Sequence, residues 1–407
     1  MIVLRHISQL ARCPAEFDQQ DAGLLEDAAL VAEGSKITWV GHDKDLPTAF
    51  REIDGVDCQN KLVIPGLIDC HTHLCFGGWR GDEFEMRLQG RSYQEIASAG
   101  GGIRSTVAAT RETPKDALFE KALGALSGML ELGVTTVECK SGYGLDYASE
   151  LKQLEIYRQL DQTQDISLVT TFLGAHMVPE EYTENRQAYV DLLCNKLIPD
   201  IAERGLAQFC DAFVEQGAFS LAEGRQILQS ASIAGLGLKL HADQLSDGGG
   251  AALAAELGAV SAEHLEYASL KGIEAMAKAG TVAVSLPLAS LYLREAYMQA
   301  RVMLNAGVKV AVATDFNPGS APSYHLPLAM TLACINQQMT PQEVLTGATT
   351  IAARAISAAN RIGSLTPGFE ADIAIIDAPS LNHWLYHFRA NACCAVIKSG
   401  HWQRTFC

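Results

Sequence analysis

The chain has 407 residues, 48% hydrophobic and 19% charged, so it can bury a large core and is not expected to be disordered. Its 31 basic and 47 acidic side chains give a net charge of −16, which argues against nucleic acid or an anionic membrane as a partner. Eleven scattered cysteines without a CxxC pair indicate reduced thiols. Because we find neither a signal segment nor a membrane-length apolar run, we expect a cytoplasmic protein.

Both ends of the chain have the pattern of β-strands. Residues 30–32 and 37–41 flank a Glu-Gly pair and predict a hairpin, and residues 371–377 and 395–398 are apolar runs typical of strands. Each piece is too short to form a domain alone. We therefore predict that residues 1–64 and 360–407 combine into one small, discontinuous β-sandwich domain.

Between these ends, short apolar runs alternate with helical patterns. The runs predict eight strands, near residues 62–69, 135–140, 167–173, 208–214, 236–241, 259–264, 282–286 and 308–314. The helical patterns cover residues 116–132, 149–160, 185–204, 221–234, 248–257, 270–279, 296–306 and 327–338. Eight βα units over residues 65–359 predict an α/β fold, a TIM-like (β/α)8 barrel.

The predicted strand ends carry the residues that could bind a metal. Catalytic residues of such barrels gather at the carboxyl ends of the strands. His71 and His73 end the first strand and point to the same side, since side chains alternate along a strand. His241 and His264 end the fifth and sixth strands, and Asp315 ends the eighth. A lone histidine or aspartate in such a place is commonly structural, but four strand ends together favour a metal site.

Three imidazoles and one carboxylate, from His71, His73, His241 and Asp315, leave a coordination position for water. Such ligands suit zinc and iron equally, so both remain open. The fourth strand offers no lysine that could be carbamylated between two metals, so we expect a single divalent or trivalent ion. Asp315 can also accept the proton of the water, and His264 can hydrogen-bond the nucleophile or stabilise an oxyanion.

Several segments indicate a particular family of enzymes. Residues 65–74 resemble the first-strand signature of the amidohydrolase superfamily, and further segments resemble its imidazolonepropionase family, at residues 80–85, 99–107, 140–145, 173–176 and 314–320. The resemblance implies the third step of histidine degradation, hydrolytic ring opening of 4-imidazolone-5-propanoate to N-formimidoyl-L-glutamate. It also implies substrate contacts from Arg80, whose guanidinium fits a carboxylate, and from Tyr143, His176, Asn317, Gly319 and Ser320.

One position departs from many relatives. Gln244 stands three residues after His241, where a proton-shuttling glutamate is common. Glutamine cannot take up a proton at neutral pH but can hydrogen-bond a ring, so we assign Gln244 to substrate binding.

Two other interpretations stay open at this point. A nucleobase or cyclic-amidine deaminase would share the metal ligands, although Gln244 and Arg80 argue against it. A non-catalytic scaffold on the same fold would have lost metal ligands, whereas all four are present. A nucleotide-binding loop at the glycines of residues 100–102 is disfavoured because the motif spacing is missing. We expect a homodimer, which is common on this architecture.

Overall fold

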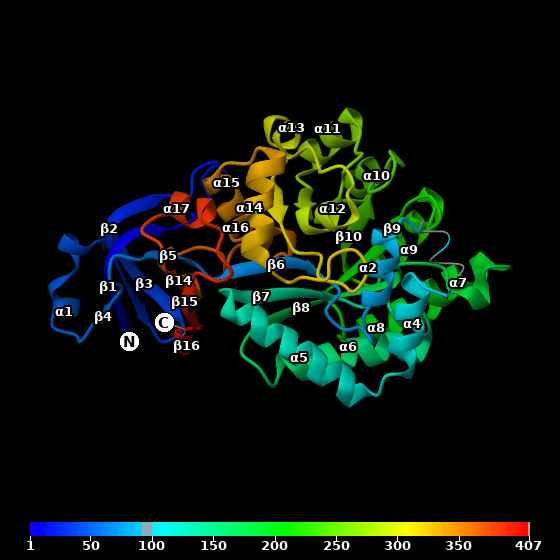
Figure 1. The fold of residues 1–407 in the computed structure, drawn as a ribbon, viewed down its shortest axis with the longest axis horizontal. Helices are drawn as coiled ribbons and strands as arrows, with labels where there is room; N and C mark the ends of the chain where they lie inside the picture. Colours follow the sequence, from blue (N-terminus) through cyan, green and yellow to red (C-terminus); the bar gives the residue numbers. More distant parts are fainter. Residues whose placement is uncertain (92–94, 96–99, 406–407) are drawn as a thin grey trace.

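The computed structural model describes residues 1–91, 95 and 100–405. The first residue of the motif at 99–107 and the last two residues of the predicted terminal domain lie outside this part. Two eight-stranded sheets organise the described residues, a parallel barrel and a mixed sheet built from both ends of the chain. Figure 1 shows the mixed sheet at one end of the molecule, with the two termini close together.

The barrel strands lie in sequence order and every pair is parallel, as predicted. They are β6 (Leu67–Thr72), β7 (Val134–Lys140), β8 (Ser167–Ala175), β9 (Phe209–Val214), β10 (Gly237–Ala242), β11 (Ser261–His264), β12 (Val282–Ser285) and β13 (Val310–Val312). All but a few of their residues are buried, because helices cover the outside and side chains fill the inside. The (β/α)8 prediction is therefore confirmed.

Helices cover the barrel and link its strands (Figure 1). They are α2 (Gly81–Leu88), α4 (Ile103–Glu112), α5 (Lys115–Glu131), α6 (Tyr147–Asp161), η2 (Glu180–Tyr182), α7 (Arg186–Leu192), η3 (Leu193–Leu197), α8 (Ile198–Glu203), α9 (Leu221–Ile233), α10 (Gly250–Leu257), α11 (Leu270–Ala279), α12 (Pro287–Leu293), α13 (Ala300–Asn305), α14 (Leu326–Gln337), α15 (Pro341–Gly347) and α16 (Thr350–Ala355). The helix predicted at 185–204 runs from α7 to α8 through the π-helical turn η3. Capping boxes at Ser220 and Thr340 fix the starts of α9 and α15.

The terminal sheet has the strand order β16-β15-β14-β5-β1-β2-β3, and β4 also pairs with β1. Its strands are β1 (Ile2–Ala11), β2 (Leu24–Glu33), β3 (Lys36–His42), β4 (Val56–Asp57), β5 (Leu62–Pro65), β14 (Ile373–Ile376), β15 (Cys393–Lys398) and β16 (His401–Thr405). Two short helices, η1 (Asp43–Asp45) and α1 (Thr48–Arg51), follow β3, and α17 (Leu381–Tyr386), between β14 and β15, packs against α14 and α15. The predicted β2–β3 hairpin and the pairing of both ends of the chain are confirmed.

The prediction of a single strand at 62–69 is wrong, because this segment forms two strands, β5 and β6, that lie in different sheets. Gly66 separates them, and its N–H donates to the carbonyl of Asp372, the residue before β14. A Cβ on Gly66 would lie 2.4 Å from Oγ1 of Thr135 on β7. Glycine therefore lets the chain pass close to Thr135 between the two sheets, and the Pro65-Gly66 pair marks this break in the sequence.

None of the described helices has the length and apolar character needed to cross a membrane.

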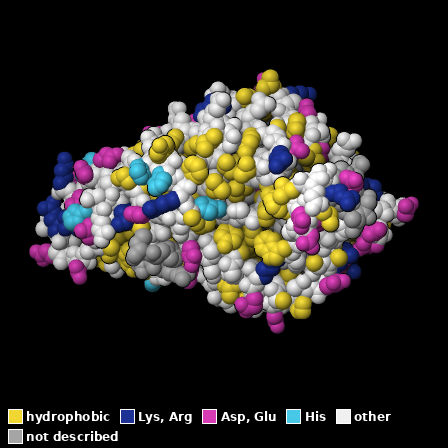
Figure 2. All heavy atoms as spheres, in the orientation of Figure 1, with side chains coloured by type: hydrophobic (Ala, Val, Ile, Leu, Met, Phe, Trp, Pro, Cys, Tyr) yellow, Lys and Arg dark blue, Asp and Glu magenta, His cyan; other side chains and the backbone are white. Residues whose placement is uncertain are grey.

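On the face seen in Figure 2, acidic and basic side chains are interspersed, and hydrophobic side chains gather over α14, where Ile335 is exposed.

The passage at Gly66 gives a first prediction. Gly66→Ala should destabilise the protein by about 1–3 kcal/mol, since overpacking displaces Thr135 or the backbone. The control is Gly124→Ala on α5, where a Cβ meets nothing within 4 Å, and it should stabilise the helix by up to about 1 kcal/mol. Chemical denaturation of both variants tests this, and equal midpoints would contradict the packing argument.

Candidate metal centre and substrate cavity

A cavity of about 790 Å³ opens where the barrel strands end. Every predicted site residue except His71 lines it, and His71 lies fully buried beside it. The lining members of the predicted set are His73, Arg80, Tyr143, His176, His241, Gln244, His264, Asp315, Asn317, Gly319 and Ser320. The structure therefore brings together all the residues that the sequence selected.

His71, His73 and Asp315 form one compact group of possible metal ligands. The Oδ1 atom of Asp315 lies 3.3 Å from Nε2 of His71 and 3.4 Å from Nε2 of His73. One ligand atom from each residue lies within 4.8 Å of the others, a separation that a single ion can span. All three side chains are buried.

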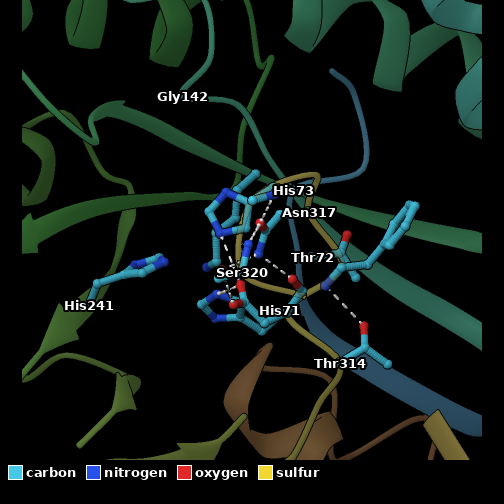
Figure 3. A network of polar contacts seen from close by, with 12 residues as sticks. His71, Thr72, His73, Gly142, His241, Thr314, Asn317 and Ser320 are labelled. Atoms are coloured by element: carbon cyan, nitrogen blue, oxygen red, sulfur yellow. Dashed lines mark hydrogen bonds and ion pairs between the residues drawn. The ribbon is translucent and has the colours of Figure 1, made fainter. Parts of the chain in front are cut away.

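A second group shares His71 with the first and adds His241 and His264. The ring centroids of His71 and His241 are 4.6 Å apart, and those of His241 and His264 are 5.4 Å apart. Figure 3 shows His71 and His73 beside Ser320 and Asn317, with the ring of His241 pointing toward them from the opposite side. The four predicted metal ligands thus surround one place, with His264 next to it.

Hydrogen bonds that close the barrel set this geometry. The N–H of Asp315 donates to the carbonyl of His71 over 3.0 Å, and the N–H of His73 donates to the carbonyl of Phe316 over 2.9 Å. Asp315 has a φ of 57°, in the left-handed region that non-glycine residues rarely adopt. His264, with a φ of 74°, shares this conformation, so backbone strain is concentrated at the cluster.

The electrostatics favour the protonation states that bind a cation. Burial lowers the pKa of His71 well below its ordinary value, with a further contribution from the charge of Lys140, and burial also lowers the pKa of His73. Burial alone would raise the pKa of Asp315, but its contacts with His71 and His73 hold it well below the usual range. Neutral imidazoles beside an ionised carboxylate are the forms that coordinate metals.

The residues present fit a metal ion. Buried ring nitrogens without a hydrogen bond, within the described residues, include both nitrogens of His71, both nitrogens of His241, and Nδ1 of His73 and of His264. Buried polar atoms normally have partners, and such a concentration at one place points to a group that they would bind. Nitrogen and oxygen donors together suit a borderline metal such as zinc.

Arg80 enters the cavity from the start of α2 and is held by Glu83. Its Nε and Nη2 atoms lie 2.9 and 2.8 Å from Oε2 of Glu83. The other oxygen of Glu83 accepts from the N–H of Gly102 over 2.9 Å. A Cβ on Gly319 would lie 2.2 Å from Nη1 of Arg80, so glycine leaves the space that the guanidinium occupies.

Tyr143 and His176 form an aromatic wall beside the candidate metal ligands. The ring of His176 stacks on His73 at 5.1 Å, and Tyr143 packs against both. The Nδ1 atom of His176 lies 3.0 Å from the carbonyl oxygen of Gly142. Burial raises the pKa of Tyr143, so its hydroxyl is neutral at physiological pH.

The loop after Asp315 is organised by Asn317. Its Oδ1 accepts the N–H groups of Gly319 and Ser320 over 2.7 and 2.8 Å, and its Nδ2 donates to the carbonyl of Asp315. The hydroxyl of Ser320 lies 3.3 Å from Oδ2 of Asp315. Several N–H donors of this loop therefore already have partners within the loop, although its residues line the cavity.

Sequence reasoning missed the charged residues behind the site. Glu83 was not singled out, nor were five buried groups inside the barrel: Glu138, Lys140, Asp211, Lys239 and Glu263. Their signal was available, because charged residues recur at every second position of otherwise apolar strands, as in Glu138 and Lys140. Such spacing places them on the inner face of the barrel beneath the strand ends.

The barrel and its His/Asp cluster define a class of protein, the metal-dependent barrel hydrolases. A model of the amidohydrolase family matches residues 62–402, so the chain belongs to that family. Its sequence is 46% identical to a protein named imidazolonepropionase from Brevibacillus brevis, over 98% of this chain and 96% of that protein. A protein of the same name from Symbiobacterium thermophilum is 48% identical, over 94% and 91%. Within the amidohydrolases, the chain is thus a member of the imidazolonepropionase family.

Solved structures share the fold at low sequence identity. The 5-methylcytosine deaminase from Klebsiella pneumoniae liganded with 5-fluorocytosine superposes with a TM-score of 0.76 at 16% identity, covering 100% of this chain and 98% of that one. Atrazine chlorohydrolase from Arthrobacter aurescens complexed with zinc gives 0.69 at 19% identity, covering 99% and 95%. These similarities concern the architecture alone.

The site geometry predicts which histidines bind metal. His73→Ala should reduce bound metal well below that of the unmodified protein after dialysis, because it removes a ligand of the compact group. His176→Ala is the matched control, since its stacked ring lies outside both groups that contain His71 and should leave the metal content unchanged. Elemental analysis measures both, and equal metal loss in the two variants would contradict the assignment.

Proposed function

We propose that this protein hydrolyses 4-imidazolone-5-propanoate to N-formimidoyl-L-glutamate, the third step of histidine degradation. The observation that supports this most directly is a single cavity that combines the His/Asp cluster with Arg80. Such a cavity suits a small ring that is attacked by water at one end and carries a carboxylate at the other. The relatives named imidazolonepropionase support the same substrate.

In the proposed reaction, the oxygen of water adds to the ring carbonyl carbon, the bond from this carbon to the ring nitrogen breaks, and the nitrogen takes up a proton. Asp315, ionised and facing the cavity, accepts the proton of water and can return it to the leaving nitrogen. His264 donates a hydrogen bond to the carbonyl oxygen as negative charge develops there. Burial opposes its protonation, but the carboxylate of Glu266 outweighs this effect and raises the pKa of His264.

We propose that His71, His73, His241 and Asp315 hold one ion, zinc or iron. When bound, such an ion lowers the pKa of water toward about 7 and so supplies a nucleophile near neutral pH. Asp211, His241 and Glu263 form a third group that could hold a cation, but lysine side chains already contact its two carboxylates, so we propose one ion rather than two. The ammonium of Lys140 lies 2.9 Å from Asp211, and that of Lys239 lies 3.2 Å from Glu263, so these carboxylates are already neutralised.

Arg80 is proposed to hold the propanoate carboxylate with a bidentate pair of hydrogen bonds. Its link to Glu83 supports this role, because a guanidinium held from one side loses less conformational entropy when it binds an anion. Tyr143, His176 and Gln244 would contact the ring, and Asn317, Gly319 and Ser320 would shape the opposite wall. The homodimer, the cytoplasmic location and the division at residues 64 and 360 remain proposals from the sequence.

The purified protein should convert 4-imidazolone-5-propanoate and should leave cytosine and guanine unchanged. Ring opening is followed by the loss of substrate absorbance and by mass spectrometry of the product. Ammonia release from a nucleobase, without ring opening of the imidazolone, would replace this proposal by a deaminase.

Asp315→Asn should retain the fold and reduce kcat by about 10²- to 10⁴-fold, because the amide cannot accept a proton. Circular dichroism checks the fold, and metal content is measured in parallel so that turnover can be expressed per bound ion. Turnover per ion close to that of the unmodified protein would refute the proton-transfer role.

Arg80→Ala should raise KM by about 10- to 100-fold with a smaller effect on kcat. The reason is that substrate binding loses hydrogen bonds to a charged group, which are worth about 1.5–3 kcal/mol. Arg104→Ala on α4 is the control, since Arg104 is half-exposed and should leave KM unchanged. An unchanged KM in the Arg80 variant would remove Arg80 from substrate binding.

A further inference from the structure

The ring of His241 contacts a buried carboxylate behind the cluster. Its Nδ1 atom lies 2.9 Å from Oδ2 of Asp211, and the backbone N–H of His241 donates to Oδ1 of the same carboxylate over 3.2 Å. The two residues stand on neighbouring parallel strands, β10 and β9. Asp211 is fully buried and His241 nearly so. One carboxylate thus accepts the backbone N–H of His241 and also lies beside its ring, and a flipped ring would place a carbon in the position of Nδ1.

Asp211 is itself held by a buried lysine. The Nζ atom of Lys140 lies 2.9 Å from Oδ2 of Asp211 and 2.8 Å from Oε1 of Glu138. The hydroxyl of Thr171 donates to Glu138 as well. A carboxylate buried in a barrel stays ionised only with a partner of opposite charge, and the ammonium of Lys140 provides it.

We propose that Asp211, held by Lys140, is a positioning residue that keeps His241 protonated on Nδ1 and leaves Nε2 free for the metal. An Nδ1 atom beside a carboxylate oxygen carries the hydrogen, so the other nitrogen keeps its lone pair. Both ring nitrogens are buried without a hydrogen bond of regular geometry among the described residues, but Nδ1 lies 2.9 Å from a carboxylate oxygen of Asp211, and Nε2 is the nitrogen left for a metal. The opposite tautomer would direct an N–H at the ion. The inference rests on the proposed metal site.

The test is Asp211→Asn, which preserves size and removes the charge. Competition with a chelator should show a dissociation constant for Zn²⁺ that is about 10- to 100-fold higher, the usual effect of losing such a partner. The Co²⁺-substituted variant should also show a shifted visible spectrum, since the ring of His241 is no longer fixed.

The chain offers a matched control in the terminal sheet. Asp372 is likewise buried, and it pairs with Lys398 over 2.6 Å and accepts the N–H of Ser399, but it contacts no candidate ligand. Asp372→Asn should reduce stability without changing zinc affinity or the cobalt spectrum. Zinc affinity of the Asp211 variant within twofold of both the control and the unmodified protein would overturn the proposal.

A second measurement needs no variant. In the zinc-loaded protein labelled with ¹⁵N-histidine, two-bond proton–nitrogen correlations should show His241 protonated on Nδ1, and protonation on Nε2 would overturn the proposal. Neither measurement depends on turnover. A protein that binds zinc in this way but does not open the imidazolone ring would refute the proposed function and leave the role of Asp211 intact.

Discussion

The closure of the barrel between β6 and the segment after β13 is the constraint on which the site depends. Two backbone hydrogen bonds join this segment to the end of β6, from Asp315 to His71 and from His73 to Phe316. They bring residues more than 240 positions apart in the sequence into contact and force Asp315 into a left-handed conformation. Three of the four candidate metal ligands, the loop of Asn317 and the space for Arg80 at Gly319 all lie at this junction.

The fold also requires that the charged side chains buried inside the barrel are paired. The barrel interior carries Glu138, Lys140, Asp211, Lys239 and Glu263, which would destabilise the fold if they were unpaired. Each lies in contact with a group of opposite charge. Three acidic and two basic groups thus form ion pairs beneath the cavity, while the cluster above keeps ring nitrogens without partners. This division separates the groups that maintain the barrel from those available for chemistry.

Much of this arrangement could be predicted from the sequence. Eight alternating βα units gave the barrel, and the rule that parallel strands end at one face brought His71, His241 and Asp315 together. The Pro65-Gly66 pair signals a break in the apolar run, but the change of sheet at Gly66 could not be predicted, because its neighbours Thr135 and Asp372 are distant in the sequence. The partner of His241 was also hidden, although that of Arg80, Glu83, stands only three residues away in the sequence. Side-chain pairing inside a barrel depends on register between strands, which the local pattern does not contain.

The central claim is that one ion is held by ligands from β6, from β10 and from the segment after β13. The most direct measurement is anomalous scattering from crystals of the purified protein, recorded at the zinc and iron absorption edges. The account predicts one peak per chain, within bonding distance of His71, His73, His241 and Asp315. A second peak beside Asp211 and Glu263, in place of the lysine contacts, or a single peak away from His71 and Asp315, would contradict it.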